Sequence, residues 1–329
     1  MQFRTTIEIK PFEQKIDHSH PILSLGSCFA SNVAERLARA KFCVTSSPTG
    51  ILFNPESIAS AIERFDAVGR GDRGALPIAE DLSFDKGCWF SFDFHSDFSR
   101  TNAEETLSAM REAVTRGAAA LQQAQTIIIT FGTAFLYRLM RSGEVVANCH
   151  KQPHADFARE MMSVEEIASR YIALLNGPLC SKRVIFTVSP VRHLADGLEQ
   201  NSLSKATLRI AIAEVMKACH NASYFPSYEI MTDELRDYRF YADDMAHPST
   251  LAIDYIWQRF GETALSDYTR SLNERIERIV KATEHRPFNS QSEEYKTFCN
   301  TMLRRAQELE QECGYIDMSK EKEFFNAYL

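Results

Sequence analysis

The sequence predicts an α/β fold in which a parallel five-stranded sheet is covered by helices on both faces, a three-layer α/β/α architecture. Two segments, 126–131 and 183–188, are apolar without alternation, which is typical of parallel strands buried on both faces. Further short apolar segments alternate along the chain with stretches of helical periodicity, and this alternation indicates strands joined by helices. Right-handed crossovers then bring the carboxyl ends of all the strands to one edge of the sheet.

Each element is predicted from its periodicity and its end signals. Residues 3–10 alternate between apolar and polar side chains and predict an edge strand. Buried strands are predicted at 21–25, 42–45, 126–131, 183–188 and 222–225. Capping residues and apolar periodicity predict helices at 29–41, 54–65, 102–123, 163–175, 202–220 and from 249 onward.

Two β excursions and a helical extension complete the predicted fold. The segment 89–95 alternates aromatic and polar residues, and 134–147 has the pattern of a hairpin around Ser142-Gly143. After about residue 265 the chain is helical, polar and charged, with a break at Arg286-Pro287. We therefore divide the chain into a domain at 1–285 and a C-terminal helical extension at 286–329, whose helices are a candidate surface for forming a homo-oligomer.

The composition is that of a soluble globular protein, because 44% of the 329 residues are hydrophobic and 25% are charged. A net charge of −7 without a long basic run argues against nucleic acid as a partner. No apolar run reaches the roughly 20 residues that cross a bilayer. Residues 1–10 lack the apolar core of a signal peptide. We expect a cytoplasmic protein without a membrane partner.

The turn after the first buried strand carries a hydroxyl and a thiol, Ser27 and Cys28, at the start of a helix. Ligands of α/β folds bind at such turns, where the helix N-terminus offers free N–H groups and partial positive charge. Ser27 is either a helix cap or a nucleophile. A serine nucleophile needs a base and a group that orients the base, and the pair Asp244-x-x-His247 has suitable spacing.

The chain resembles two related groups of proteins at these motifs. Gly26-Ser-Cys-Phe-Ala30 is the motif that names the GSCFA family, and the order of Gly26-Ser27 and Asp244-x-x-His247 resembles the SGNH/GDSL hydrolases. The resemblance runs from about Ser24 to Phe260. Its other segments are Asn148–Lys151, Thr187–His193, Asp196-Gly197, Asn201–Lys205, Tyr224–Glu229 and Leu235–Tyr241.

The resemblance implies a flavodoxin-like, SGNH-hydrolase-like sheet and an esterase or deacetylase that needs no cofactor. Ser27 would attack the carbonyl of a small-molecule or carbohydrate acyl ester, His247 would act as general base and then acid, and Asp244 would orient His247. A non-catalytic binding module on the same fold and an O-acyltransferase are the alternatives.

The resemblance also implies an oxyanion hole, in which the N–H of Ser27 and the N–H of Gly50 would stabilise the developing negative charge. The sequence departs from the superfamily pattern here, because no Asn follows Gly132 within a few residues. Asn148, returned to the edge by the 134–147 hairpin, is the predicted substitute.

Other polar residues around the motifs are candidates for substrate binding. Gly132, His150 and His193 are expected to line the pocket, and Lys151 with Arg192 is expected to recognise an anionic group.

The remaining thiols and imidazoles do not form a metal signature. Pro153 interrupts the spacing of His150 and His154, and we expect no metal. The eight cysteines are scattered without a CxxC pair and are expected to be reduced. Cys28 is expected to pack inward and is kept as an alternative nucleophile.

Overall fold

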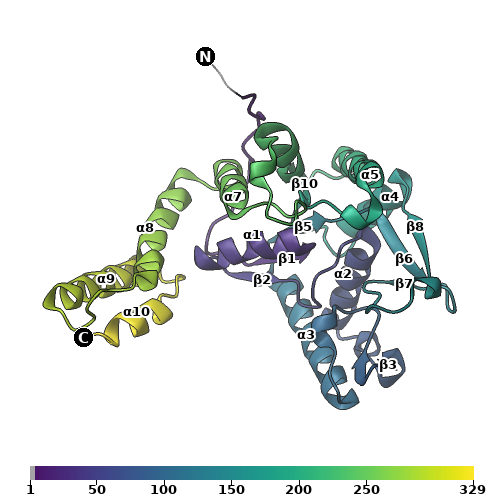
Figure 1. Cartoon of the computed structure of the whole chain (residues 1–329), viewed down its shortest axis with the longest axis horizontal. Coiled ribbons are helices and arrows are strands. Elements are labelled where there is room, and N and C mark those ends of the chain that lie inside the picture. Colours follow the sequence, from purple (N-terminus) through teal and green to yellow (C-terminus); the bar gives the residue numbers. More distant parts are fainter. Residues whose placement is uncertain (1–3) are drawn as a thin grey trace.

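The computed structural model describes residues 4–329 and confirms the predicted sheet. Its strands lie in the order β10-β9-β5-β1-β2, and every neighbouring pair is parallel (Figure 1). Their bounds are β1 (Ile22–Gly26), β2 (Val44–Ser46), β5 (Thr126–Phe131), β9 (Arg183–Val188) and β10 (Ala222–Phe225). The predicted three-layer α/β/α arrangement is therefore the observed one.

Helices cover both faces because successive strand residues point to opposite sides of the sheet. Leu23 and Leu25 of β1 belong to one core, with side chains of α2 (Pro55–Gly69), α3 (Ala103–Gln123), α4 (Val164–Asn176) and α5 (Leu198–Ala218). Ile22 belongs to a second core on the other face, with side chains of α1 (Cys28–Arg39) and α7 (Thr250–Ala264). Burying each large apolar side chain contributes about 1.5–3 kcal/mol.

The strand register aligns the carboxyl ends of the three central strands. Gly26 at the end of β1 is paired with Thr130, and Phe131 at the end of β5 is paired with Val188 at the end of β9. Gly26 must be a glycine, because its φ is +133° and an added Cβ would lie 2.1 Å from the carbonyl oxygen of Thr130. This close approach positions the turn that follows β1.

Both predicted β excursions are present as small antiparallel sheets. One is the hairpin of β3 (Ser83–Asp85) and β4 (Cys88–Phe90). Strand β4 ends at Phe90 and is therefore shorter than the predicted segment 89–95. The other places β6 (Phe135–Leu139) between β7 (Val145–Val146) and β8 (Phe157–Met161).

The C-terminal helices form a separate small core beside the sheet (Figure 1). They are α8 (Asp267–Glu284), α9 (Glu293–Glu312) and α10 (Ser319–Asn326). Their shared core begins at Leu272, so α8 packs with the residues that follow the predicted boundary at 285/286. The half-buried pair Lys41–Glu321, at 2.7 Å, connects this unit to the end of α1. No helix between residues 4 and 329 combines the length and apolar composition needed to cross a bilayer.

Two predictions about local structure were wrong. Residues 4–10 form no strand, because side chains take up backbone groups there: Ile7 N–H donates to Glu234, and Arg259 donates to the Ile7 carbonyl. Phe3, the first residue of that predicted strand, lies outside the described residues. Helix α5 begins at Leu198 rather than at 202, since Gly197 with φ of +81° turns the chain into it.

Candidate functional site at the carboxyl edge of the sheet

Ser27 lies at the N-cap position of α1 without acting as a side-chain cap. Asn54 and Ser249 cap their helices through side-chain oxygens that accept N–H groups of Ser57 and Ala252. The Oγ of Ser27 makes no such bond, and within residues 4–329 it has no hydrogen-bond partner at all, His247 included. The Ser27 residue is 1% exposed, so its hydroxyl is shielded from solvent as well as unpaired.

Cys28 is half-buried: its side chain packs against the second core, as predicted, but part of it borders solvent. The reason is the extended backbone of Ser27, with ψ of 174°, which turns the Ser27 side chain toward the end of β5. The pKa of the Cys28 thiol is raised overall, because burial outweighs the N–H groups of Phe29 and Cys28 and the ammonium of Lys205, which act to lower it. The carboxylate of Asp244 is also near enough to raise this pKa.

Asp244 and His247 form the predicted pair in the loop before α7. The Nδ1 of His247 lies 2.6 Å from Oδ2 of Asp244, while Oδ1 of Asp244 accepts the N–H groups of Ala246 and His247, each at 2.9 Å. These bonds, that from His247 N–H first, lower the pKa of Asp244 to about 2. Nε2 of His247 is left as the proton acceptor, as a general base requires.

The backbone fixes this loop against the end of β9. Arg192 N–H donates to the Ala246 carbonyl at 3.0 Å, and Ala242 N–H donates to the His247 carbonyl at 2.8 Å. Met245 between them has φ of +54°, in the left-handed region that favours glycine. The imidazole therefore has a defined position although its side chain is 50% exposed.

Lys205 of α5 is a site residue that the sequence analysis did not single out. Its Nζ donates to the carbonyl oxygens of Gly132, at 2.5 Å, and Ser189, at 2.8 Å, which follow β5 and β9. The side chain is 1% exposed. Burial lowers its pKa to about 7, although the charges of Cys28 and Asp196 act to raise it. Its sequence signals were its place in the segment Asn201–Lys205 of the family resemblance and its position three residues before Leu208, on the apolar face of a helix.

His193 belongs to the same cluster. Burial, and then the charge of Lys205, lower its pKa to about 4, so its imidazole is neutral near pH 7. The charge of His247 and a backbone hydrogen bond with Gly132 also act on it, and its ring meets Phe53 edge-on at 6.0 Å. His193 is thus a neutral group beside Gly132, and the role of both residues in lining a substrate pocket stays a prediction.

Two of the predicted oxyanion donors, the backbone N–H groups of Ser27 and Gly50, are engaged elsewhere, which corrects that part of the prediction, whereas the role of the Asn148 side-chain amide stays a prediction. The N–H of Ser27 donates to the Thr130 carbonyl at 3.1 Å, and the N–H of Gly50 donates to the Ser47 carbonyl at 2.8 Å. Asn148 donates its N–H to Phe92 and accepts the N–H of His150 through Oδ1. Gly50 is instead required by packing, because an added Cβ would lie 2.2 Å from Cβ of His95.

His150 anchors the β excursions, and its role in substrate binding stays a prediction. Its Nε2 lies 2.8 Å from the Ser91 carbonyl and 3.0 Å from that of Phe94, and its ring stacks on Phe90 at 4.4 Å. Burial lowers its pKa. Lys151 is exposed, with φ of +56°.

Arg192 lies next to the Asp244–His247 loop, as the sequence placed it. Its guanidinium stands 4.0 Å from the ring centre of Tyr241 and 5.1 Å from that of Tyr238. Stacked on two aromatic rings, it is held beside this loop, where its positive charge suits an anion.

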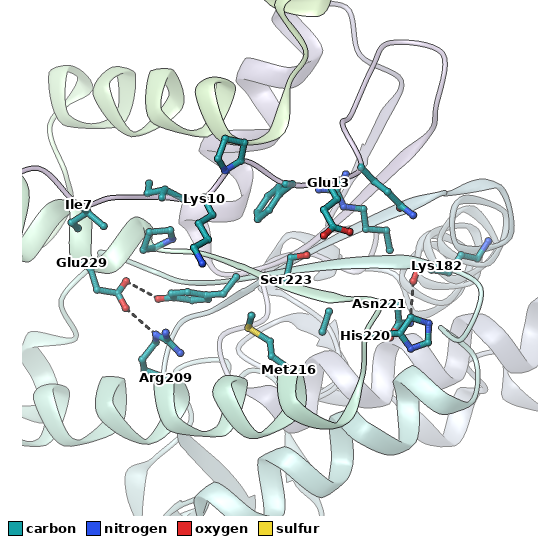
Figure 2. Close-up of a pocket in the computed structure, with 18 of the residues that line it drawn as sticks. Ile7, Lys10, Glu13, Lys182, Arg209, Met216, His220, Asn221, Ser223 and Glu229 are labelled. Carbon is teal, nitrogen blue, oxygen red and sulfur yellow. Dashed lines mark hydrogen bonds and ion pairs between the residues drawn. The ribbon is translucent and has the colours of Figure 1, made fainter.

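Among residues 4–329, no group of three His, Cys, Asp or Glu side chains is arranged to hold a metal ion. A large cavity, about 1080 Å³, lies away from this edge, between residues 7–14, β10 and α5, near the start of β9 (Figure 2). There Arg209 is paired with Glu229 at 3.1 Å.

Comparison with known proteins agrees with the motif. Residues 21–260 match the model of the GSCFA family, and residues 276–329 match that of the C-terminal domain of GSCFA domain proteins. No curated protein matches the chain. The first match alone spans more than half of the 329 residues and ends within α7, just after the Asp244–His247 loop. The chain therefore belongs to the GSCFA family.

Proposed function

We propose that the protein hydrolyses an acyl ester through a covalent acyl-enzyme, in the manner of the SGNH hydrolases. The observation that carries the proposal is the bond between Asp244 and His247, at 2.6 Å. It fixes the tautomer of the imidazole and leaves Nε2 to take a proton. The pair lies at the sheet edge that also carries the β1–α1 turn, since the Asp244 charge acts on the Cys28 thiol.

The chemistry requires a nucleophile on the turn, and Ser27 is the one that the sequence predicts. The nucleophile would attack the acyl carbon while His247 takes its proton. His247 would then return that proton to the leaving alcohol, and a water molecule deprotonated by His247 would release the acid. Asp244 would stay ionised throughout, because its pKa is about 2.

Two features favour particular substrates and products. The guanidinium of Arg192, stacked on Tyr241 and Tyr238, suits an anionic group on a small-molecule or carbohydrate ester. The side chains of His247 and Asp244 are 50% and 51% exposed, which favours water over an alcohol as the acyl acceptor. Transfer to an alcohol would need a site closed to water.

Turnover of p-nitrophenyl acetate by the parent chain and by His247→Ala tests the proposal. We expect a loss of about 100-fold or more in kcat, the usual contribution of a general base. His220→Ala is the matched control, because His220 is an exposed histidine of the distant cavity in Figure 2 and reports non-specific attack by imidazole. Equal rates for the parent and His247→Ala would leave a non-catalytic binding module as the better account.

A further inference from the structure

The two side chains of the β1–α1 turn differ in their access to a substrate. The Oγ of Ser27 is shielded from solvent, and the backbone of Gly132 lies against Cβ of Ser27, since an added Cβ at Gly132 would come within 3.2 Å of it. The Ser27 backbone is fixed at both ends: its N–H donates to Thr130, and its carbonyl accepts the N–H of Ala30 at 2.8 Å. Cys28, the next residue, is half-buried and borders solvent.

A buried lysine, Lys205, lies near enough to Cys28 for the charge of each to act on the other. The Nζ of Lys205 is bonded to two neutral carbonyl oxygens. Asp196, the acidic residue whose charge supports it, is already paired with Arg159 at 2.6 Å. A buried ammonium is unfavourable unless a negative group faces it. A thiolate at Cys28 is the negative group that most favours the charged form of Lys205.

The start of α1 adds two further donors at the same place. The N–H groups of Cys28 and Phe29, in the first turn of the 12-residue helix α1, act on the Cys28 sulfur. Sulfur at such a position is stabilised as the anion by the helix N-terminus. The same N–H groups would also stabilise an oxyanion, a role for which the backbone N–H groups of Ser27 and Gly50 are not free.

We propose that the Cys28 thiol, rather than the Ser27 hydroxyl, is the nucleophile of the site, with the protonated form of Lys205 as the cation that stabilises its anionic form. This inference rests on the proposed acyl hydrolysis. The sulfur bonds to the acyl carbon, and its proton passes to Nε2 of His247. The ester C–O bond then breaks, and the alcohol leaves with that proton. Water, deprotonated by His247, attacks the thioester, which releases the acid and restores the thiol.

Turnover by single variants of the full chain separates this inference from the proposed function. We expect Cys28→Ala to lose at least about 100-fold more kcat than Ser27→Ala does. Cys180→Ala is the control for general thiol reactivity, because Cys180 is exposed and lies in the distant cavity. If Ser27→Ala loses more than Cys28→Ala while His247→Ala is inactive, the inference is overturned and the proposed function stands. A fully active His247→Ala removes both.

Alkylation tests the role of Lys205 without any turnover. Cys149 is a matched thiol, half-buried like Cys28, but burial alone acts on it and raises its pKa to about 11. In the parent chain at pH 7.5, iodoacetamide should modify Cys28 at least about tenfold faster than Cys149, as followed by peptide mass spectrometry. Lys205→Met should slow Cys28 about tenfold and leave Cys149 unchanged.

Equal rates for Cys28 and Cys149 in the parent chain would overturn the inference, and this comparison does not depend on whether Lys205→Met folds. A folded Lys205→Met chain that alkylates Cys28 at the parent rate would overturn the role of Lys205. Folding of the variant is checked by its thermal unfolding transition.

Discussion

The carboxyl edge of the sheet and the large cavity of Figure 2 are contrasting regions of one molecule. The cavity has the volume, about 1080 Å³, and holds a satisfied carboxylate, because Glu229 accepts from Arg209 at 3.1 Å and from Tyr224 at 2.7 Å. At the edge, Lys205 donates only to neutral carbonyl oxygens, and the hydroxyl of Ser27 has no hydrogen-bond partner among the described residues. Unbalanced polar groups, rather than volume, mark the reactive region.

One residue of the cavity goes against this contrast. Arg183 lines the cavity, its Nη2 is buried without a partner, and burial lowers its pKa to about 10. Its guanidinium lies 4.9 Å from the ring centre of Phe12, an aromatic neighbour instead of a base or a nucleophile. A perturbed group alone therefore does not make a catalytic site. The edge combines such groups with a base–carboxylate pair.

The largest effect is expected from Asp244→Asn. The variant keeps the shape of the side chain but loses the charge that orients and stabilises the His247 imidazole, so kcat for p-nitrophenyl acetate should fall by about 100- to 10,000-fold. Asp233→Asn, in the cavity, is the matched control and should keep the parent rate. An Asp244→Asn chain as active as the control would place the chemistry outside the Asp244–His247 pair.

A smaller loss is expected from Lys205→Met. Without the buried cation the anionic form of the nucleophile is less favourable, so kcat should fall by about 10- to 100-fold with little change in KM. Arg183→Met, which removes the perturbed cation of the cavity, is the control and should have the parent kcat. A loss confined to KM in Lys205→Met would indicate a role in substrate binding instead.

Lys205 should also make stability depend on pH. Its pKa is about 7 in the folded chain and ordinarily 10.5, so between these pH values the unfolded chain binds a proton that the folded chain does not. Stability should therefore rise with pH across this window, by at most about 1.4 kcal/mol per pH unit relative to Lys205→Met. Urea unfolding of both chains at pH 7 and pH 9 measures the difference. A parallel response of the two chains would mean that Lys205 keeps its ordinary pKa.

The smallest effect is expected from Arg209→Ala in the cavity. The variant breaks the pair with Glu229, whose two side chains are 41% and 25% exposed, so it should cost about 0.2–1 kcal/mol in stability. Turnover should stay within about twofold of the parent. A large loss of activity would show that the cavity, and not the edge alone, serves the reaction.

The same contrast explains how much the sequence reveals. The buried strands at 126–131 and 183–188 were predictable from apolar runs, and the Asp244–His247 pair from spacing, because both are local patterns. The prediction of a strand at residues 4–10 was wrong, because an alternating pattern does not show whether a partner strand is available.

The details of the site depend on backbone geometry and on distant neighbours. Which of Ser27 and Cys28 faces solvent is set by the extended ψ of Ser27 and the close approach of Gly132. Lys205 was missed because its partners, the Gly132 and Ser189 carbonyls, follow strands that lie far from it in the sequence. In the sequence, a buried lysine of this kind is indicated by a lysine on the apolar face of a predicted helix.

The site of acylation tests the central claim most directly. The full chain is mixed with p-nitrophenyl acetate, quenched in acid and digested with trypsin, and the acetyl group is located within the peptide 16–36, which holds both Ser27 and Cys28. We predict acetyl on Cys28 as a thioester that neutral hydroxylamine removes, and its absence from His247→Ala. An acetyl group on Ser27 that resists hydroxylamine and also forms in Cys28→Ala would contradict the account.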